Sequence, residues 1–454
     1  MSIPARSRGS SVARARDSYA ARHLLVPVQK FIHTESSSGF VLLAAAALAL
    51  LWVNSPWNSS YHALWNAEVS LRFGPFLLAH SLREWVNDAL MVLFFFVVGL
   101  EVKREFVHGE LSDWRKASLP IAAALGGMVV PAALYAVMNA GTSTSRGCGI
   151  PMATDIAFAV GVLALLGDRI PATLRILLLA LATVDDIGAI LVIAFFYTDQ
   201  ISPIPVLASL LLIFMMVGMW KIGLRKIGYF LPIAVLFWFA VLQSGIHATI
   251  AGVVLGLMTP TVAALGQKKY ARTATLLLKE LAEAEQQGSR ERADAILGEV
   301  EELTASTETP ADRLLRLLHP WSSYVALPIF ALANAGVVLT PTAVRAAFVA
   351  PETQGILVGL GFGKVAGIVL LSYLAVRLRL VVLPQGVRWA HMAGIGLLGG
   401  IGFTVSLFIS DLAFANPDNI ANAKTGILVV SLLAGLLGFL VLRVSSRSQS
   451  SIPG

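Results

Sequence analysis

The amino-acid sequence predicts an all-α polytopic membrane protein with twelve transmembrane helices. Of its 454 residues, 56% are hydrophobic and only 13% are charged, whereas soluble globular proteins carry about 25% charged residues. Apolar runs of roughly 20 residues, the length that spans a bilayer as a helix, recur along the chain. These runs are continuous, as in ALPIFALANAGVVL at 326–339. A transmembrane β-barrel would instead show alternating segments of about 10 residues, so the pattern excludes a barrel.

Apolar runs bounded by charged residues, proline or glycine mark the twelve predicted spans. They lie near residues 39–55, 84–102, 117–138, 148–166, 172–198, 203–220, 227–242, 246–261, 320–338, 353–376, 389–410 and 422–442. The first run is too long for a cleaved signal peptide, so we expect a retained helix. The chain then divides into an N-terminal tail (1–38), spans one to eight (39–261), a long loop (262–319), spans nine to twelve (320–442) and a C-terminal tail (443–454).

The basic residues indicate how the chain is oriented in the membrane. Cytoplasmic loops are enriched in Lys and Arg, and nearly all of the 34 Lys and Arg residues fall on the same side as the N-terminal tail. The opposite side holds only Arg72, Arg83, Arg146, Arg345 and Lys424. Both termini are therefore predicted to be cytoplasmic, and the net charge of +7 needs no nucleic-acid partner.

Two of the loops are unusually long. Residues 56–83 contain the alternating stretch VSLRF, then Gly-Pro and FLLAHSL, which favours an external β-hairpin. The 262–319 loop mixes acidic and basic residues with apolar positions at helical spacing and has a break near Gly288. We expect a solvated cytoplasmic helical pair there; a dedicated regulatory or partner site is the alternative.

Four charged residues lie well inside predicted spans, away from the span ends. They are Asp155 in the fourth span, Asp185 and Asp186 in the fifth, and Lys364 in the tenth. A charged side chain at mid-membrane costs roughly 2.5 to 3.5 kcal/mol on insertion scales, so each needs a reason. The structural alternative is a salt bridge that holds helices together.

One lysine cannot neutralise two adjacent carboxylates, and this imbalance favours a binding site. Like charges so close repel each other, so that protons or a small hard cation are needed to neutralise them. A site that binds either ligand but disfavours both together meets the core requirement of a cation/proton exchanger. The donors are oxygens of Asp185, Asp186 and Thr154, which suit Na⁺ or Li⁺ better than a transition metal. The single cysteine, Cys148, excludes an intramolecular disulfide or a cysteine cluster, and we expect no cofactor.

Two predicted spans carry signs of interruption at mid-membrane. The fourth contains Pro151 and the polar pair Thr154 and Asp155, and the eleventh has glycines at 394, 396, 399, 400 and 402. Interrupted helices in corresponding halves indicate a secondary transporter built from inverted repeats, here spans 3–5 and 10–12. Asp155 and Lys364 are then placed to compensate the partial charges of helix ends at the crossing. For the glycines alone, close helix packing is an equal alternative.

Several motifs in one order carry a resemblance to a known family. They are NDALMVLFFFVVGLEVKREF (87–106), ATDIAFAVGVLALLGDRIP (153–171), VDDIGAI (184–190), SGIHATIAGV (244–253), LHPW (318–321), FALANAGV (330–337), GK (363–364) and GIGFTVSLFI (400–409). From about residue 30 to 444 the chain resembles the NhaA-type sodium/proton antiporters. That family is itself a known example of inverted-repeat construction, so the repeat prediction is not independent of the resemblance.

The resemblance implies a protein of the bacterial inner membrane that exports Na⁺ or Li⁺ in exchange for protons and serves pH and sodium homeostasis. It also implies a homodimer formed through the external hairpin. Asp185 and Asp186 match the family's ion-binding and proton-carrying aspartates, and Thr154 matches a residue near the cation. Asp155 matches the residue that compensates helix ends, and Lys364 matches the lysine that pairs with the first aspartate.

Three further residues match family positions connected with pH response: His247, Glu101 and Glu105. A hydrogen-bonded core histidine explains His247 equally well, and solvated end charges explain the two glutamates almost as well. Leu315 is a departure, because well-studied members carry a glutamate associated with pH sensing there. The predicted transport site is intact, whereas the sequence does not predict how transport depends on pH.

The predicted function is an electrogenic antiporter that works by alternating access and is not an enzyme. One alternative is an intramembrane aspartyl protease, which uses one aspartate on each of two helices with a Gly-x-Gly-Asp signature that this chain lacks. The others are a passive cation channel and proton-coupled transport of an organic solute, the latter disfavoured because few buried polar donors are present.

Overall fold

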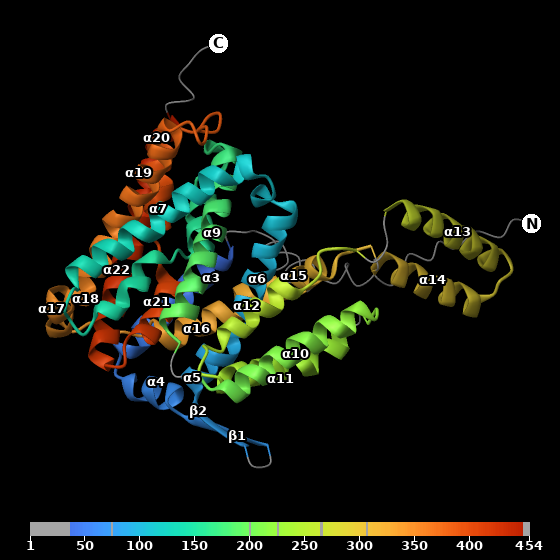
Figure 1. Cartoon of the computed structure of the whole chain (residues 1–454), viewed down its shortest axis with the longest axis horizontal. Coiled ribbons are helices and arrows are strands. Elements are labelled where there is room, and N and C mark those ends of the chain that lie inside the picture. Colours follow the sequence, from blue (N-terminus) through green and yellow to red (C-terminus); the bar gives the residue numbers. More distant parts are fainter. Residues whose placement is uncertain are drawn as a thin grey trace, which may run out of the picture.

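A computed structural model describes residues 37–73, 76–198, 201–224, 227–263, 267–305 and 307–447 (Figure 1). The predicted N-terminal tail lies outside the described residues except for 37 and 38. The predicted C-terminal tail lies outside them except for 443–447. Almost all regular structure in the described part is helical.

The first half of the chain supplies most of the helices that surround the site. In chain order the elements are α3 (Ser37–Val53), α4 (Asn58–Trp65), β1 (Glu68–Phe73), β2 (Phe76–Ser81), α5 (Leu82–Trp85), the π-helical turn η2 (Val86–Leu90), α6 (Met91–His108), η3 (Glu110–Ser112), α7 (Trp114–Met138), the 3₁₀ segment η4 (Ser145–Met152), α8 (Ile156–Ala164), η5 (Gly167–Arg169), α9 (Ala172–Phe196), α10 (Pro203–Lys221), α11 (Ile227–Gln243) and α12 (Thr249–Met258).

The second half begins with two helices outside the main helical body and then returns to it. Its elements are α13 (Gln267–Gln286), α14 (Arg290–Ala305), α15 (Pro310–Trp321), the π-helical turn η6 (Ser322–Ala326), α16 (Leu327–Asn334), α17 (Pro341–Val349), α18 (Pro351–Val358), the π-helical turn η7 (Gly359–Gly363), α19 (Lys364–Arg377), α20 (Trp389–Gly399), α21 (Phe403–Ala413) and α22 (Pro417–Arg447).

Several helix starts follow from local sequence. Asp113 accepts a hydrogen bond from the Arg115 amide at the start of α7, and Thr340 caps α17 just before a proline. Ser81 and Glu84 form a reciprocal capping box that starts α5 directly after β2. Such caps satisfy amide groups that the first helical turn leaves without intrahelical partners.

Among the described residues, seven helices are long and apolar enough to cross a membrane, or up to nine if two bent pairs each count as one span. The bent pairs are α3 with α4, at 117°, and α20 with α21, at 47°. The protein is thus an all-α polytopic membrane protein. The count of twelve and the inverted repeats remain predictions. The counts differ because some predicted spans fold as shorter pieces, for example α12 with 10 residues.

The segment 56–83 contains a two-stranded antiparallel ribbon. Strand β1 pairs with β2 so that Glu68 faces Ser81 and Phe73 faces Phe76. The indole of Trp85 donates to the Val69 carbonyl at 2.9 Å, which connects the ribbon to α5. The ribbon extends from the helical body beside α4 and α5 (Figure 1). Its location outside the cell remains a prediction.

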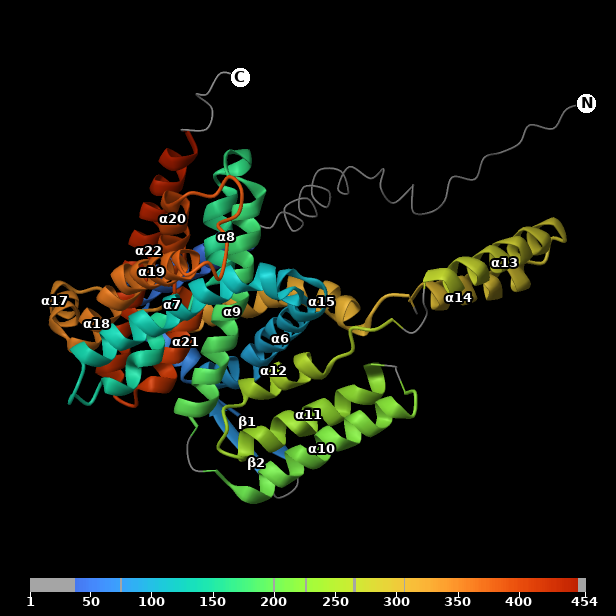
Figure 2. The same cartoon turned by 45° about the horizontal axis from the view of Figure 1, so that its top comes forward.

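Helices α13 and α14 form an antiparallel pair that projects from the helical body in both views (Figure 2). Leu277, Ala284 and Ile296 form a small apolar cluster between the two helices. Gly288, with φ of +72°, allows the reversal between them, since only glycine adopts this backbone region without steric cost. The pair has its own small core, as the spacing of its apolar residues requires.

The packing of α7 against α19 brings two backbones into unusually close contact. A Cβ added to Gly126 would lie 2.0 Å from the Gly367 carbonyl oxygen, and the reciprocal distance is also 2.0 Å. Only glycine permits such an approach, which is common between transmembrane helices. The contact holds the start of α19, and with it Lys364, against α7.

Candidate functional site

Three chain segments meet at a buried polar site in the helical body. Asp185 and Asp186 lie midway along α9, which has no break at this point. Thr154 lies in the extended stretch between η4 and α8. Lys364 is the first residue of α19 and directly follows the π-helical turn η7. π-helical turns are frequent at functional sites because they shift the direction of neighbouring side chains.

Lys364 and Asp185 form an ion pair, and both side chains are buried away from solvent. The Nζ to Oδ2 distance is 2.6 Å, and both side chains are 0% exposed. Lys364 also donates to the Met152 carbonyl, which belongs to the last residue of η4. The lysine stem packs against Gly127 and Gly399. The Lys364 ammonium group therefore binds both a carboxylate and the negative end of a helical segment.

Thr154 connects this ion pair to the other interrupted helix. Its hydroxyl lies 2.7 Å from Asp185 Oδ2 and 2.9 Å from the Gly399 carbonyl oxygen, and Gly399 is the last residue of α20. Asp185 Oδ1 is buried and has no hydrogen-bond partner in the described structure. One oxygen of Asp185 is thus fully used while the other remains available as an acceptor.

Asp186, the next residue along α9, has a different environment. Its side chain is buried, and among the described residues its carboxylate has no hydrogen-bond or ion-pair partner, unlike that of Asp185. The negative charges of Asp185, Glu101 and Asp155 repel a negative charge on Asp186. A buried carboxylate without a partner is costly, so this group needs a proton or a cation to be accommodated.

Asp155 lies where the two interrupted helices cross. Its carboxylate accepts from the Phe158 amide at 3.1 Å, in the first turn of α8. It also accepts from the Thr404 amide at 3.1 Å and the Thr404 hydroxyl at 2.5 Å, in the first turn of α21. The Asp155 amide in turn donates to the Ile401 carbonyl at 2.6 Å.

One carboxylate therefore serves the amino ends of two helices, α8 and α21. Helix amino ends carry partial positive charge and stabilise anions. The carboxyl ends of η4 and α20 are served by Lys364 and by the Thr154 hydroxyl, as described above. All four ends at the crossing thus have a partner of suitable charge or polarity.

Glu101 and Glu105 lie on α6, and Glu101 is close enough for its charge to act on Asp186. Glu101 is 3.7 Å from the His319 ring on α15, and Glu105 accepts from the Glu110 amide at 3.1 Å. Leu315 on α15 is buried against Val97 and Leu100 of α6. The position where family members carry glutamate is therefore part of an apolar contact between α6 and α15.

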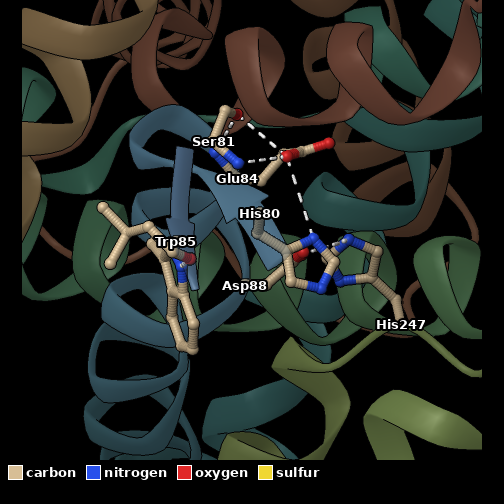
Figure 3. A network of polar contacts seen from close by, with 7 residues as sticks. His80, Ser81, Glu84, Trp85, Asp88 and His247 are labelled. Carbon is tan, nitrogen blue, oxygen red and sulfur yellow. Dashed lines mark hydrogen bonds and ion pairs between the residues drawn. The ribbon is translucent and has the colours of Figure 1, made fainter. Parts of the chain in front are cut away.

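His247 belongs to a second polar network, whose acidic partner is Asp88 and not Asp185 or Asp186 (Figure 3). Its ring contacts the Thr249 hydroxyl at 2.8 Å and the Asp88 carboxylate at 3.7 Å, and it meets Phe408 edge to face. In the same network His80 of the ribbon lies 3.8 Å from Glu84 of α5. The network connects the ribbon, α5, the turn η2 that carries Asp88, and the start of α12.

The structure brings together Thr154, Asp185 and Lys364, with Asp186 beside them and Asp155 at the adjacent crossing. Sequence reasoning missed the partners on the second interrupted helix: Thr404 and the carbonyls of Gly399 and Ile401, along with the Met152 carbonyl. Thr404 had a signal, since it is a hydroxyl residue directly after a glycine-rich break. The carbonyl groups had none.

In the described part of the chain, no set of three or more His, Cys, Asp or Glu side chains is arranged to hold a metal ion. The arrangement instead offers two carboxylates, one hydroxyl and one competing lysine. The same carboxylate oxygens can bind a proton, the Lys364 ammonium group or a small cation in turn.

Comparison with known proteins gives matches over most of the chain. The family model described as Na⁺/H⁺ antiporter 1 matches residues 29–442. The chain is 46% identical over 431 residues to Na⁺/H⁺ antiporter NhaA of Oleidesulfovibrio alaskensis, covering 94% of this chain and 95% of the relative. It is 44% identical over 414 residues to the protein of the same name from Rhodopirellula baltica, covering 91% and 93%. The chain therefore belongs to the Na⁺/H⁺ antiporter 1 family, which makes it a membrane transporter and not an enzyme.

Proposed function

We propose that this chain is an electrogenic antiporter that exports Na⁺, or Li⁺, in exchange for protons by alternating access. Asp185, Asp186 and Thr154 form the shared cation and proton site. The observation that carries the proposal is the unequal charge at that site. One lysine pairs with Asp185 at 2.6 Å, while the neighbouring buried Asp186 has no ion-pair or hydrogen-bond partner among the described residues.

This imbalance explains how one site selects one ligand at a time. With Asp186 protonated and Asp185 paired with Lys364, the buried charges balance. A cation that binds Asp186 and the Thr154 hydroxyl competes with the proton for Asp186 and with Lys364 for Asp185. The site accommodates only a limited buried charge, because each uncompensated charge costs desolvation free energy, so each ligand disfavours the other.

Alternating access then converts competition into transport. Facing the cytoplasm, where the proton activity is low, the aspartates release protons and accept Na⁺. Facing outward, protons displace the ion and Lys364 recovers Asp185. Asp155 compensates the helix ends at the crossing throughout the cycle. Lys364 does so once it has paired with Asp185 again.

The outward-facing site holds two protons, one on Asp186 and one on Lys364 in its pair with Asp185. Both protons leave when the cation takes the two carboxylates, so two protons move against one Na⁺ and each cycle moves net charge. The membrane potential supplies about 2.3 kcal/mol per elementary charge per 100 mV. Transport by this protein therefore accelerates when the potential draws positive charge inward. This drive lets it expel sodium even when the proton gradient is small.

We assign the pH response to His247, Glu101 and Glu105. Glu101 and Glu105 lie on α6, and Glu101 contacts α15 through His319 at 3.7 Å. His247 contacts α21 through Phe408, and α21 also carries Thr404 at the crossing. Protonation of these groups changes contacts that position the two interrupted helices.

The remaining family expectations complete the proposal. The protein resides in the bacterial inner membrane with both termini cytoplasmic, as its basic residues indicate. It forms a homodimer through the external ribbon, and the α13–α14 pair lies in the cytoplasm.

The site assignment is tested with everted vesicles that contain a pH-sensitive dye. Addition of Na⁺ or Li⁺ to vesicles with the wild-type chain should dissipate an imposed proton gradient. The Asp186→Asn variant should abolish this response, because it cannot carry the proton or balance the cation. The matched control is Asp418→Asn, an exposed aspartate at the start of α22, which should retain exchange. Retained exchange in the Asp186 variant would refute the assignment.

Electrogenicity is tested in liposomes by imposing a potassium diffusion potential at equal pH on both sides. Na⁺ efflux should accelerate with one sign of potential and slow with the other. Efflux that ignores the potential would contradict the stoichiometry, and Na⁺ flux without proton counterflow would favour a passive channel.

A further inference from the structure

An apolar groove runs along an exposed side of α19 and α20. It has a volume of ≈ 420 Å³, and all seven side chains that line it are apolar or aromatic. Phe362, Val369 and Tyr373 contribute from the η7 and α19 side, and Ala393 from α20. Phe362 and Tyr373 are exposed on the protein, and within a membrane such surface faces lipid chains.

The groove ends at an aromatic pair next to a basic residue. Tyr373 meets Trp389 of α20 edge to face, with ring centroids 5.4 Å apart. Arg377 follows Tyr373 by one helical turn, about 6 Å along the axis, and is exposed. Trp and Tyr concentrate at the level of lipid headgroups, so this end of the groove marks the membrane interface.

The turn after α19 carries exposed basic and apolar residues, with Val381 buried among them. Leu378, Leu380 and Val382 are 67%, 71% and 86% exposed, and Arg377 and Arg379 lie among them. Neither arginine forms an ion pair with any described residue. Apolar side chains beside unpaired cations are typical of segments that enter the interface of an anionic membrane.

Arg379 also holds an unfavourable backbone conformation. Its φ is +58°, the one positive value at a non-glycine residue in the described ranges. The Leu380 amide donates to the Ala375 carbonyl and the Arg379 amide to the Val376 carbonyl, which is the Schellman arrangement that normally places glycine at this position. An L-residue is strained in this backbone conformation. A cation is thus kept where the backbone favours glycine.

We propose that the groove and the α19–α20 turn bind an anionic phospholipid of the bilayer. One acyl chain lies in the groove, and the headgroup phosphate binds Arg377 and Arg379 beside the aromatic pair. The basic turn lies on the predicted cytoplasmic side, so the lipid belongs to the inner leaflet. The continuity of an apolar groove with two unpaired cations favours an amphipathic anion over a second protein copy or a free anion.

The test uses the full chain, delipidated in detergent, with retained lipid measured by native mass spectrometry. Dioleoylphosphatidylglycerol and dioleoylphosphatidylcholine are supplied as an equal mixture. Each arginine near an anionic surface contributes about fivefold in affinity. We expect the wild type to retain phosphatidylglycerol preferentially. Combined Arg377→Gln and Arg379→Gly substitutions should weaken that retention about 25-fold.

Arg379→Gly separates folding from binding, because glycine relieves the backbone strain and the variant should unfold at the same or a higher temperature. Arg379→Lys keeps the charge and should keep the preference. Arg115→Gln, at an exposed arginine near the start of α7 on the same predicted side, is the matched control and should behave as wild type. If Arg115→Gln lost as much of the preference for phosphatidylglycerol as the double variant, the preference would come from surface charge in general. That outcome would overturn the proposal.

The groove is tested by Ala393→Phe, which fills it while both arginines remain. It should lower phosphatidylglycerol retention, whereas Leu165→Phe, in a separate apolar groove between α3 and α8, should not. Unchanged retention in Ala393→Phe would overturn the acyl-chain assignment. If inorganic phosphate stabilised the wild type as much as phosphatidylglycerol does, the site would be one for a free anion. That result would overturn the lipid assignment.

Discussion

Lys364 and Asp185 form a fully buried ion pair at 2.6 Å, and each also bonds to an interrupted segment of the chain. Burying two charges costs more than their attraction returns unless the geometry is excellent. The pair therefore carries stored cost that a competing cation can use. In the proposed mechanism, this cost eases the displacement of Lys364 from Asp185 by the cation.

Single and double substitutions of this pair should be strongly non-additive in stability. Lys364→Met or Asp185→Asn alone leaves an unpaired buried group and should cost about 3 to 5 kcal/mol. The double variant removes both charges and should recover most of that loss, because neutral side chains of similar size pack without a desolvation penalty. Thermal unfolding in detergent measures all three. A double variant at least as unstable as the worse single variant would contradict this account.

Asp155 should be more important for folding than its single charge suggests. Its carboxylate accepts three hydrogen bonds at two helix starts, and hydrogen bonds to charged groups contribute about 1.5 to 3 kcal/mol each. Asp155→Asn should therefore lower stability by roughly 3 kcal/mol or more. Thr404→Val removes only the hydroxyl contact and should cost about half as much. Ser410→Ala, which removes a local bond within α21, is the control and should cost least.

The chemistry of the site was more predictable from sequence than its geometry. Asp155, Asp185, Asp186 and Lys364 are conspicuous because ionisable residues are rare in apolar runs. The sequence could not indicate which carbonyls face Lys364 and Thr154, because every residue has the same carbonyl. A carbonyl becomes available only where a helix ends, and the ends of η4 and α20 depend on packing.

The same limit applies to the fold. Continuous apolar runs predict membrane helices well, because each run needs no partner to be recognised. The π-helical turn before Lys364 and the contact between Gly126 and Gly367 depend on residues far apart in the chain. The apolar environment of Leu315 likewise follows from the docking of α15 on α6, which the helix pattern alone does not predict.

A glutamate at position 315 should make this protein's stability depend on pH. Leu315 is buried between α15 and α6, and burial raises the pKa of an introduced carboxyl above its reference of about 4.3. The folded state then favours the protonated form, so stability falls as pH rises through that raised pKa. Leu315→Glu should lose stability relative to wild type between about pH 5 and pH 8.

The control for that experiment is Leu317→Glu on the same helix, where the leucine is 49% exposed. An exposed carboxyl keeps its ordinary pKa, so its stability difference from wild type should be flat over the same range. The Arg104–Asp312 pair spans the same interface and is unchanged in both variants. A flat profile for Leu315→Glu would show that α15 separates from α6 to solvate the new charge.

The contact between Gly126 and Gly367 should control the position of Lys364. An alanine at either residue would bring a Cβ to 2.0 Å from the opposite backbone oxygen, so α19 must move away from α7. Such overpacking typically costs 1 to 3 kcal/mol. Because Lys364 lies one turn before Gly367, the shift should also weaken its pairing with Asp185 and slow sodium-driven proton movement. Gly218→Ala in α10 has open space and should instead gain up to about 1 kcal/mol in helix stability with unchanged transport. If Gly367→Ala retained full stability and full exchange, the close approach would have no part in holding the lysine.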